Sequence, residues 1–396
     1  MIPVAVAGAT GAVGQRFLQL LDGHPTFEVA AVTAGPKRIG SPLGDADWVL
    51  DGTWPAAAAR LRLQAPEDLA GAGVRVVFSA LPSEQAGPME TAWAEAGLAV
   101  FTNASSHRMD ADVPLLIPEI NPDHLDMVQG RKGFIVANGN CSGIIVTLPL
   151  GALHQAFGLR EVHVMTEQAL SGAGIGGIEP AAIHDNVLPF IREEEEKLEE
   201  EPQKTLGADI PVHATCTRVN VTDGHLAALH VTLGRSVTWD EVEQALAGFQ
   251  GPEAVRALPT APEHPILVRT EADRPQPRLD RDAEGGEQRL QRPAVQKAHH
   301  APLDGDAGCG RPGGGQQLDR RDVEGDFFGQ TNVDRSDDFE AYSYSIELRQ
   351  PIFRLDHWRE RGVASLRVGA ATARLDAAEV DLMLRVAEAY FAALDA

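Results

Sequence analysis

The chain has 396 residues, 43% of them hydrophobic, which is enough for two folded domains that each bury a core. Its formal net charge of −23 at pH 7 argues against binding to nucleic-acid phosphates or to an anionic membrane surface. No stretch is long and apolar enough for a membrane-spanning helix, and residues 1–7 do not resemble a secretory signal. We therefore expect small molecules or other proteins as partners.

The cysteines lie far apart, at Cys141, Cys216 and Cys309, without paired or metal-ligand spacing. Such usage is typical of a reducing compartment, where a thiol stays free to react. We therefore expect a cytoplasmic protein with no bound metal.

The chain opens with the pattern of a dinucleotide-binding turn. Residues 2–7 form an apolar run, Gly8, Gly11 and Gly14 follow, and helical spacing continues from residue 15. Gly8 and Gly11 would let backbone N–H groups approach a pyrophosphate, and Gly14 would let the helix pack closely on the strand. The alternative is a turn that merely needs glycine.

The segment after the next expected strand, residues 27–32, bears on the choice of cofactor. NAD-binding domains normally carry an acidic residue there, whereas this chain has Lys37 and Arg38. Two cations suit a 2′-phosphate and favour NADP(H), and a solvated basic turn is the alternative. A later expected strand, residues 74–82, ends in small residues that we expect to face the same crevice.

Cys141 is the most informative residue. It precedes an apolar helical stretch at residues 144–150, which predicts a thiol at a helix N-terminus, where the thiolate form is favoured. His225 would shuttle the proton, because imidazole titrates near neutral pH. Together with the glycine loop, these residues indicate an aldehyde or acyl-phosphate dehydrogenase; a structural cysteine and a satisfied histidine are the alternatives.

Several further motifs occur in an order that is specific to one family. They lie at residues 8–14, 78–83, 103–109, 114–119, 138–142, 167–174, 186–197, 216–225 and 274–283. Over residues 1–283 the chain resembles the archaeal and fungal-type branch of aspartate-semialdehyde dehydrogenase.

The resemblance implies an α/β fold in two parts. Residues 1–149 would form a Rossmann-type NADP-binding domain, and residues 150–284 an α+β catalytic and dimerisation domain, so a homo-oligomer is expected. Alternating runs at 161–166 and 225–233 read as strands of the second domain. The implied reaction is NADP-dependent reductive dephosphorylation of β-aspartyl phosphate to aspartate semialdehyde, in lysine, threonine and methionine biosynthesis, through a Cys141 thioester.

The resemblance also assigns the site residues. Beside Cys141 and His225, Gln168 would orient the intermediate. Residues that hold the substrate carboxylate and amino group would be Arg218 and Glu194, and those that bind the phosphate would be Arg108, Asn140 and Lys197. The cofactor residues would be Gly8, Thr10, Gly11, Ala12, Val13, Gly14, Lys37, Arg38, Ser79, Leu81 and Gly172. Without the resemblance, residues 193–201 would be interpreted as a solvated acidic helix face.

Beyond about residue 283 the family pattern ends without its final strand and closing helix. Residues 285–326 are rich in Gly, Gln, Arg, Asp and Pro, which predicts a disordered linker or a wrongly joined reading frame. Residues 327–396 carry an alternating strand pattern and a long helical pattern, and resemble the start of a TolC-like outer-membrane efflux protein. The alternatives are therefore a non-catalytic chimera or an enzyme like malonyl-CoA reductase, although Glu194 and Arg218 favour an amino-acid substrate.

Overall fold

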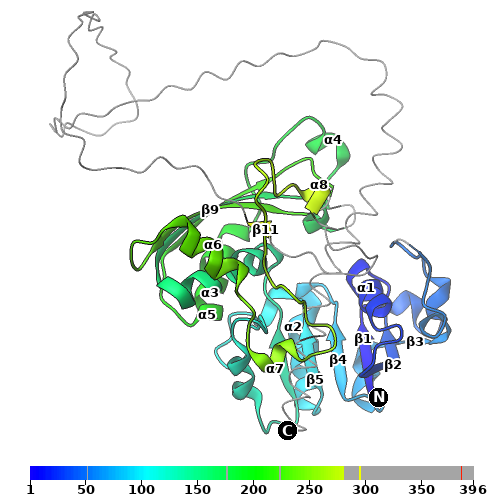
Figure 1. The fold of residues 1–396 in the computed structure, drawn as a ribbon. Helices are drawn as coiled ribbons and strands as arrows, with labels where there is room; N and C mark the ends of the chain where they lie inside the picture. The colour runs from blue at the N-terminus through cyan, green and yellow to red at the C-terminus, as the bar shows by residue number, and fades with distance from the viewer. Residues whose placement is uncertain (51, 175–176, 223, 281–293, 296–384, 386–396) are drawn as a thin grey trace, which may run out of the picture. The chain divides into compact units, whose positions relative to one another are not determined.

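The computed structural model describes residues 1–50, 52–174, 177–222, 224–280, 294–295 and 385 (Figure 1). All of them belong to one compact unit. Among these residues, no helix is both long and apolar enough to cross a membrane.

The first part of the chain forms a parallel six-stranded sheet in the order β3-β2-β1-β4-β5-β6 (Figure 1). Its strands are β1 (Ile2–Ala7), β2 (Phe27–Thr33), β3 (Leu63–Gln64), β4 (Val76–Ser79), β5 (Ala99–Thr102) and β6 (Phe134–Ala137). The strand order reverses direction between β1 and β4, and ligands of such sheets bind at the carboxyl ends of the strands at this point. The Rossmann-type fold predicted from the sequence is confirmed.

Helices cover both faces of this sheet, as its apolar strands require. The α-helices are α1 (Ala12–Leu20) and α2 (Ser83–Glu95), and the short 3₁₀ helices are η1 (Pro36–Arg38), η2 (Leu43–Asp45), η3 (Ala58–Arg60), η4 (Pro66–Gly71), η5 (Ser105–His107) and η6 (Pro122–Val128). On one face, Phe17 of α1 stacks on Phe78 of β4 with ring centroids 5.2 Å apart. On the other face, Trp93 of α2 packs in a separate core with Val77 and Val100.

The second part is a three-stranded sheet with one face covered by helices. Its strands are β7 (Leu159–Gln168), β8 (Val212–Arg218) and β9 (Leu226–Leu233), in the order β8-β7-β9, with β8 parallel and β9 antiparallel to β7. The covering helices are α3 (Cys141–Phe157), α5 (Glu194–Leu206) and α6 (Trp239–Ala247) (Figure 1). Strand residues alternate between this core and the opposite face, as β geometry dictates.

The helix α3 joins the two parts. Its residues Val146, Leu150 and Leu153 lie in the core of the second part, so the predicted boundary at residues 149–150 falls inside a helix. The remaining elements are η7 (Leu170–Ala173), α4 (Pro180–Ile183), α7 (Glu253–Arg256), β10 (Leu267–Val268) and α8 (Pro277–Asp280).

The predicted C-terminal segments are described at three residues only. Within the predicted linker 285–326, Ala294–Val295 forms a short strand, β11, that pairs in parallel with β10. Arg385 is helical and forms a buried ion pair with Glu119. The rest of the predicted linker, Cys309 and the rest of the TolC-like segment lie outside the described residues.

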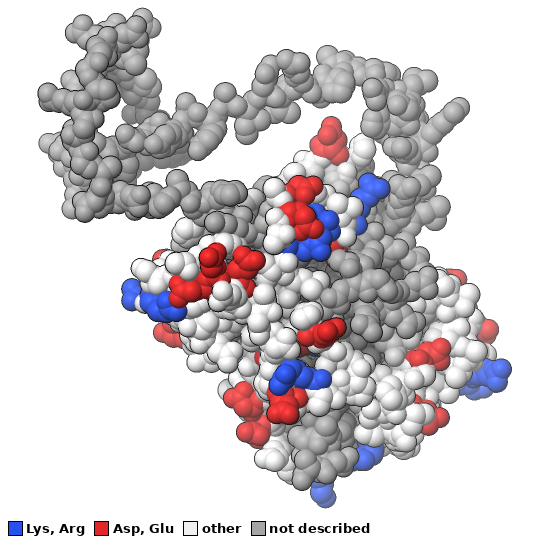
Figure 2. All heavy atoms as spheres, viewed as in Figure 1, with Lys and Arg blue, Asp and Glu red and all other residues white. Residues whose placement is uncertain are grey.

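The surface carries acidic and basic side chains in small mixed groups on the face drawn in Figure 2. Ion pairs such as Arg235 with Glu241, at 3.1 Å, and Arg269 with Glu271, at 2.7 Å, are solvent-exposed or nearly so. Because exposed pairs contribute little to stability, the apolar cores hold these elements together.

Candidate active site

The glycine loop lies between the carboxyl end of β1 and the N-terminus of α1. Gly8 has a φ of +74°, and a Cβ there would lie 2.6 Å from the carbonyl oxygen of Ala80. A Cβ on Gly14 would lie 2.2 Å from the carbonyl oxygen of Gly8, so neither position tolerates a side chain. The first turn of α1 has no acidic side chain. This cradle fits a pyrophosphate, which the backbone N–H groups and the helix dipole would hold.

The residues expected to select NADP stand where the sequence predicts. Lys37 and Arg38 lie in η1, directly after β2, and both are exposed. The Arg38 side chain is 45% exposed, and its Nη2 lies a loose 3.9 Å from Oδ2 of Asp47. Both cations are therefore accessible to a 2′-phosphate.

Two other predicted cofactor residues lie at the end of β4 and just after it. Ser79, the last residue of β4, is fully buried, as is Glu90 of α2, a carboxyl group whose pKa is raised by burial. Leu81 is half-buried against the core around Trp93.

Cys141 is the first residue of α3, as predicted, and is partly exposed. Asn140 caps this helix: its side chain accepts a hydrogen bond from the backbone N–H of Gly143 at 3.0 Å. The helix N-terminus stabilises a thiolate at this position. The other described cysteine, Cys216, is fully buried in β8, and burial raises the pKa of its thiol to about 11. Of these two thiols, Cys141 is the one whose position and exposure suit a nucleophile.

Arg218 and His225 both form hydrogen bonds with the backbone of Ala169. Nη1 of Arg218 donates to the carbonyl oxygen of Ala169 at 2.7 Å, and Nδ1 of His225 accepts from the N–H of Ala169 at 3.0 Å. A Cβ on Gly172 would lie 2.9 Å from Arg218 Nη1 and 3.1 Å from His225 Cε1. The spacing of seven residues therefore does bring the guanidinium and the imidazole together, with Gly172 against both.

The protonation state of His225 differs from the sequence-based expectation. Burial and the positive charge of Arg218 lower the pKa of His225 to about 3, so the prediction that it titrates near neutral pH is wrong. Because Nδ1 accepts a hydrogen bond, the neutral ring carries its proton on Nε2. That nitrogen is inaccessible to solvent and has no partner among the described residues. His225 is thus a neutral donor in the resting site.

Gln168 ends β7 directly opposite Arg218 in the register of β7 and β8. It is fully buried, and its Nε2 donates to Oγ1 of Thr166 at 3.3 Å. Its Oε1 has no hydrogen-bond partner among the described residues. A buried amide oxygen without a partner is costly, which suits a residue that waits for a ligand.

Glu194 and Asn140 connect α5 to the helix of the nucleophile. Glu194, the first residue of α5, is buried and accepts a hydrogen bond from Nδ2 of Asn140. Burial lowers the pKa of Arg218, and the negative charges of Cys141 and Glu194 oppose that change. Cys141, Glu194 and Arg218 therefore share one electrostatic environment.

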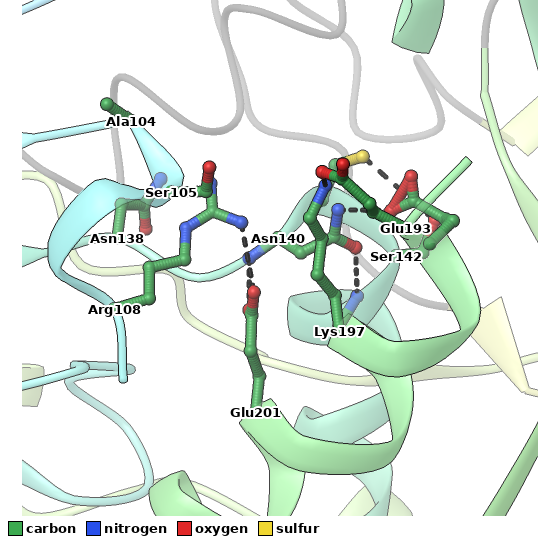
Figure 3. Close-up of polar contacts among 12 residues, drawn as sticks. Ala104, Ser105, Arg108, Asn138, Asn140, Ser142, Glu193, Lys197 and Glu201 are labelled. Carbon is green, nitrogen blue, oxygen red and sulfur yellow. Dashed lines mark hydrogen bonds and ion pairs between the residues drawn. The ribbon is translucent and has the colours of Figure 1, made fainter. Parts of the chain in front are cut away.

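The residues expected to bind phosphate are arranged around Glu201 (Figure 3). Nη1 of Arg108 lies 3.0 Å from Oε1 of Glu201, and the backbone N–H of Asn140 donates to Oε2 of Glu201 at 2.5 Å. Lys197 projects from α5 beside them, with its Nζ 4.0 Å from a carboxylate oxygen of Glu193. The structure brings Arg108 and Asn140 together through one carboxylate, whereas among the described residues Lys197 has only a loose ion pair, with Glu193.

Two residues of this region were missed by the sequence analysis, Glu201 and Lys204. Nζ of Lys204 donates to three backbone carbonyls, those of Arg108, Asp110 and Val113, at 2.6, 2.7 and 2.9 Å. A signal was available: Glu194, Lys197, Glu201 and Lys204 recur every three or four residues, which places them on one helix face. The interpretation of 193–201 as a solvated face is wrong for Glu194 and Glu201, which are 7% and 3% exposed.

A Rossmann-type sheet is followed here by a helix that starts at a cysteine, and a second sheet adds an arginine and a histidine. This combination indicates a class of protein, the semialdehyde dehydrogenases. Residues 3–128 match the family described as semialdehyde dehydrogenase, NAD binding domain. Residues 150–291 match semialdehyde dehydrogenase, dimerisation domain, so the likeness continues beyond residue 283, where the sequence analysis ended it.

Relatives narrow the class further. The chain is 47% identical over 299 residues to aspartate-semialdehyde dehydrogenase from Archaeoglobus fulgidus, covering 72% of this chain and 85% of the relative. The corresponding enzyme from Aspergillus fumigatus is 40% identical, covering 71% and 84%. A crystal structure of the Candida albicans enzyme with NADP aligns with a TM-score of 0.66 and 34% identity, covering 71% and 86%. The chain belongs to the aspartate-semialdehyde dehydrogenase family.

Proposed function

We propose that this chain catalyses the NADP-dependent reductive dephosphorylation of β-aspartyl phosphate to aspartate semialdehyde, a step in lysine, threonine and methionine biosynthesis. The observation that carries the proposal is the set of charged groups around Cys141. Its thiol begins α3 and shares its electrostatic environment with one buried cation, Arg218, and one buried anion, Glu194. A zwitterionic amino acid presents the complementary pair of charges.

Arg218 would bind the α-carboxylate of the substrate and Glu194 its ammonium group. A guanidinium fork matches a carboxylate, and Nε of Arg218 is buried without a hydrogen-bond partner among the described residues. This pair supports an amino-acid substrate over the acyl-CoA of a malonyl-CoA reductase, which has no ammonium group for Glu194.

Arg108, Asn140 and Lys197 would bind the phosphate. Arg108 is buried, and its Nε is another donor that lacks a partner among the described residues. The Lys197 side chain is 27% exposed and is held only loosely by Glu193, so it is able to reach an incoming anion. Glu201 would hold Arg108 and the backbone of Asn140 in place for this purpose.

The chemistry would proceed through Cys141. The thiolate attacks the acyl carbon, a C–S bond forms, the C–O bond to phosphate breaks, and inorganic phosphate leaves. NADPH, when bound, supplies the two electrons that reduce the resulting thioester. His225 would donate a hydrogen bond from Nε2 to the oxygen of the tetrahedral adduct, and Gln168 would orient that adduct beside the sulfur of Cys141. Cleavage of the C–S bond then releases the aldehyde and restores the thiolate.

The cofactor would lie on the glycine loop. Gly8, Thr10, Gly11, Ala12, Val13 and Gly14 would hold the pyrophosphate, Lys37 and Arg38 the 2′-phosphate, and Ser79, Leu81 and Gly172 would line the remainder. The close approaches at Gly8 and Gly14 and the accessible cations of η1 support this placement.

Three further expectations stay predictions. A homo-oligomer is supported by the match to a dimerisation domain. A cytoplasmic location is supported by Cys141 and Cys216, neither of which is in a disulfide. The likeness of residues 327–396 to TolC-like proteins falls almost entirely outside the described residues.

The test is phosphate-dependent NADP reduction with aspartate semialdehyde, measured on the full chain, on Cys141→Ala and on the matched control Cys216→Ala. We expect Cys141→Ala to lose turnover while it still binds NADP, and Cys216→Ala to retain turnover. Substantial residual turnover in Cys141→Ala would contradict the mechanism. If the unmodified chain showed neither turnover nor NADP binding, the proposed function as a whole would be contradicted.

A further inference from the structure

The face of the β8-β7-β9 sheet that is turned away from its helices carries a row of histidines. His163 of β7 is in register with His213 of β8 on one side and with His230 of β9 on the other. Glu161 lies two residues before His163 and therefore on the same face of β7. This face is opposite to the one that packs on α3, the helix that begins at Cys141.

Three of these side chains converge. Oε1 of Glu161 lies 3.4 Å from Nε2 of His163 and 3.5 Å from Nε2 of His213. One ligand atom from each of the three residues lies within 4.8 Å of the other two. In a tetrahedral zinc site with bonds of about 2.0–2.2 Å, neighbouring ligand atoms are separated by about 3.3–3.6 Å. The two carboxylate–imidazole distances match two edges of such a site.

We propose that Glu161, His163 and His213 form a site for a divalent transition-metal ion of the zinc class. Two imidazole nitrogens and one carboxylate oxygen are a donor set that zinc accepts, and three protein ligands leave a fourth position for water. The paired strands β7 and β8 hold the two imidazoles, whose ring centroids are 4.8 Å apart. The side chains are about half exposed in the single chain.

The geometry also allows a simpler role, in which Glu161 accepts hydrogen bonds from the two imidazoles and binds no ion. Zinc binding separates the two. We would titrate the full chain with zinc chloride by isothermal calorimetry in a Cys141→Ser background, so that the reactive thiol does not contribute. We expect one zinc per chain, and about tenfold or greater loss of affinity in His163→Asn and in His213→Asn.

His230→Asn is the matched control. Its ring lies on the same face, with its centroid 6.3 Å from that of His163, but it is outside the converging group. We expect this variant to bind zinc within about twofold of its parent. As a second readout, zinc should raise the melting temperature of the parent and EDTA should reverse the rise, because an ion that binds only the folded state stabilises it.

Two results would overturn the proposal. One is the absence of zinc binding to the parent chain. The other is equal zinc affinity in His163→Asn, His213→Asn and the control, which would place the ion elsewhere. In either case Glu161 serves only as the partner of two surface histidines.

Discussion

Glu201 of α5 and Arg108 of the nucleotide domain form a 3.0 Å ion pair with both side chains buried, although 93 positions separate them in the sequence. Burial raises the pKa of Glu201, and the charge of Arg108 opposes that rise. The same carboxylate accepts from the backbone N–H next to Cys141, at Asn140. One carboxylate thereby links a proposed phosphate-binding side chain to the start of the nucleophile's helix.

We expect Glu201→Gln to weaken phosphate binding more than cofactor binding. The amide keeps the shape of the side chain but loses the charge that holds Arg108, so KM for phosphate in the oxidative direction should rise about tenfold, with KM for NADP unchanged. Steady-state kinetics with each substrate varied in turn measure this. Glu200→Gln, an exposed neighbour on α5, is the control. Equal KM values for phosphate in the two variants would show that Glu201 does not position Arg108.

Lys204 should stabilise the fold through its three hydrogen bonds to backbone carbonyls. Lys204→Met keeps most of the apolar stem and leaves those carbonyls without their donor, so we expect a loss of about 2–4 kcal/mol in the free energy of unfolding. Urea denaturation followed by circular dichroism measures it. The exposed Lys132→Met should change stability by less than about 0.5 kcal/mol. A change as small in Lys204→Met would contradict the assignment.

The lowered pKa of His225 predicts acid sensitivity. Below pH 6.5 the unfolded chain binds a proton at this ring that the folded chain does not bind until about pH 3. The free energy of unfolding therefore falls as pH drops from 6.5 towards 3, and His225 makes no such contribution above that range. At pH 5 the loss is about 2 kcal/mol.

His225→Asn should therefore lose about 2 kcal/mol less stability than the unmodified chain when pH falls from 7.5 to 5, as measured by urea denaturation at both values. His184→Asn, which changes an exposed histidine, should behave like the unmodified chain. Indistinguishable pH profiles for His225→Asn and the unmodified chain would mean that the imidazole is not excluded from protonation in the fold.

Lys37 and Arg38 should decide the cofactor. Removing both cations, as Lys37→Ala with Arg38→Ala, should raise KM for NADP by about tenfold to a hundredfold, because each contact to a 2′-phosphate at this exposed site contributes about 0.5–1.5 kcal/mol. KM for NAD should stay within about twofold, since NAD has no phosphate there. Parallel assays with the two cofactors measure the ratio. An equal change for both would place these residues outside the 2′-phosphate site.

The sequence by itself determined the features that depend on neighbouring residues. The apolar run before Gly8 and the helical spacing after Gly14 predicted β1, the loop and α1, because strand, turn and helix preferences act over a few residues. The place of Cys141 at the start of α3 was predictable for the same reason. The order of the family motifs led to the proposed roles of Arg218 and Glu194, which no local sequence pattern predicts.

The tertiary structure decided everything that depends on contacts between distant segments. Residues 193–201 have the composition of a solvated helix, yet Glu194 and Glu201 are buried because α5 packs against α3 and β8. The pKa of His225 follows from its burial and from Arg218, neither of which a sequence displays. Likewise, only the pairing of β7 with β8 places His213 beside His163 and Glu161. Burial and charge proximity are properties of packing, and packing brings together residues that the chain keeps apart.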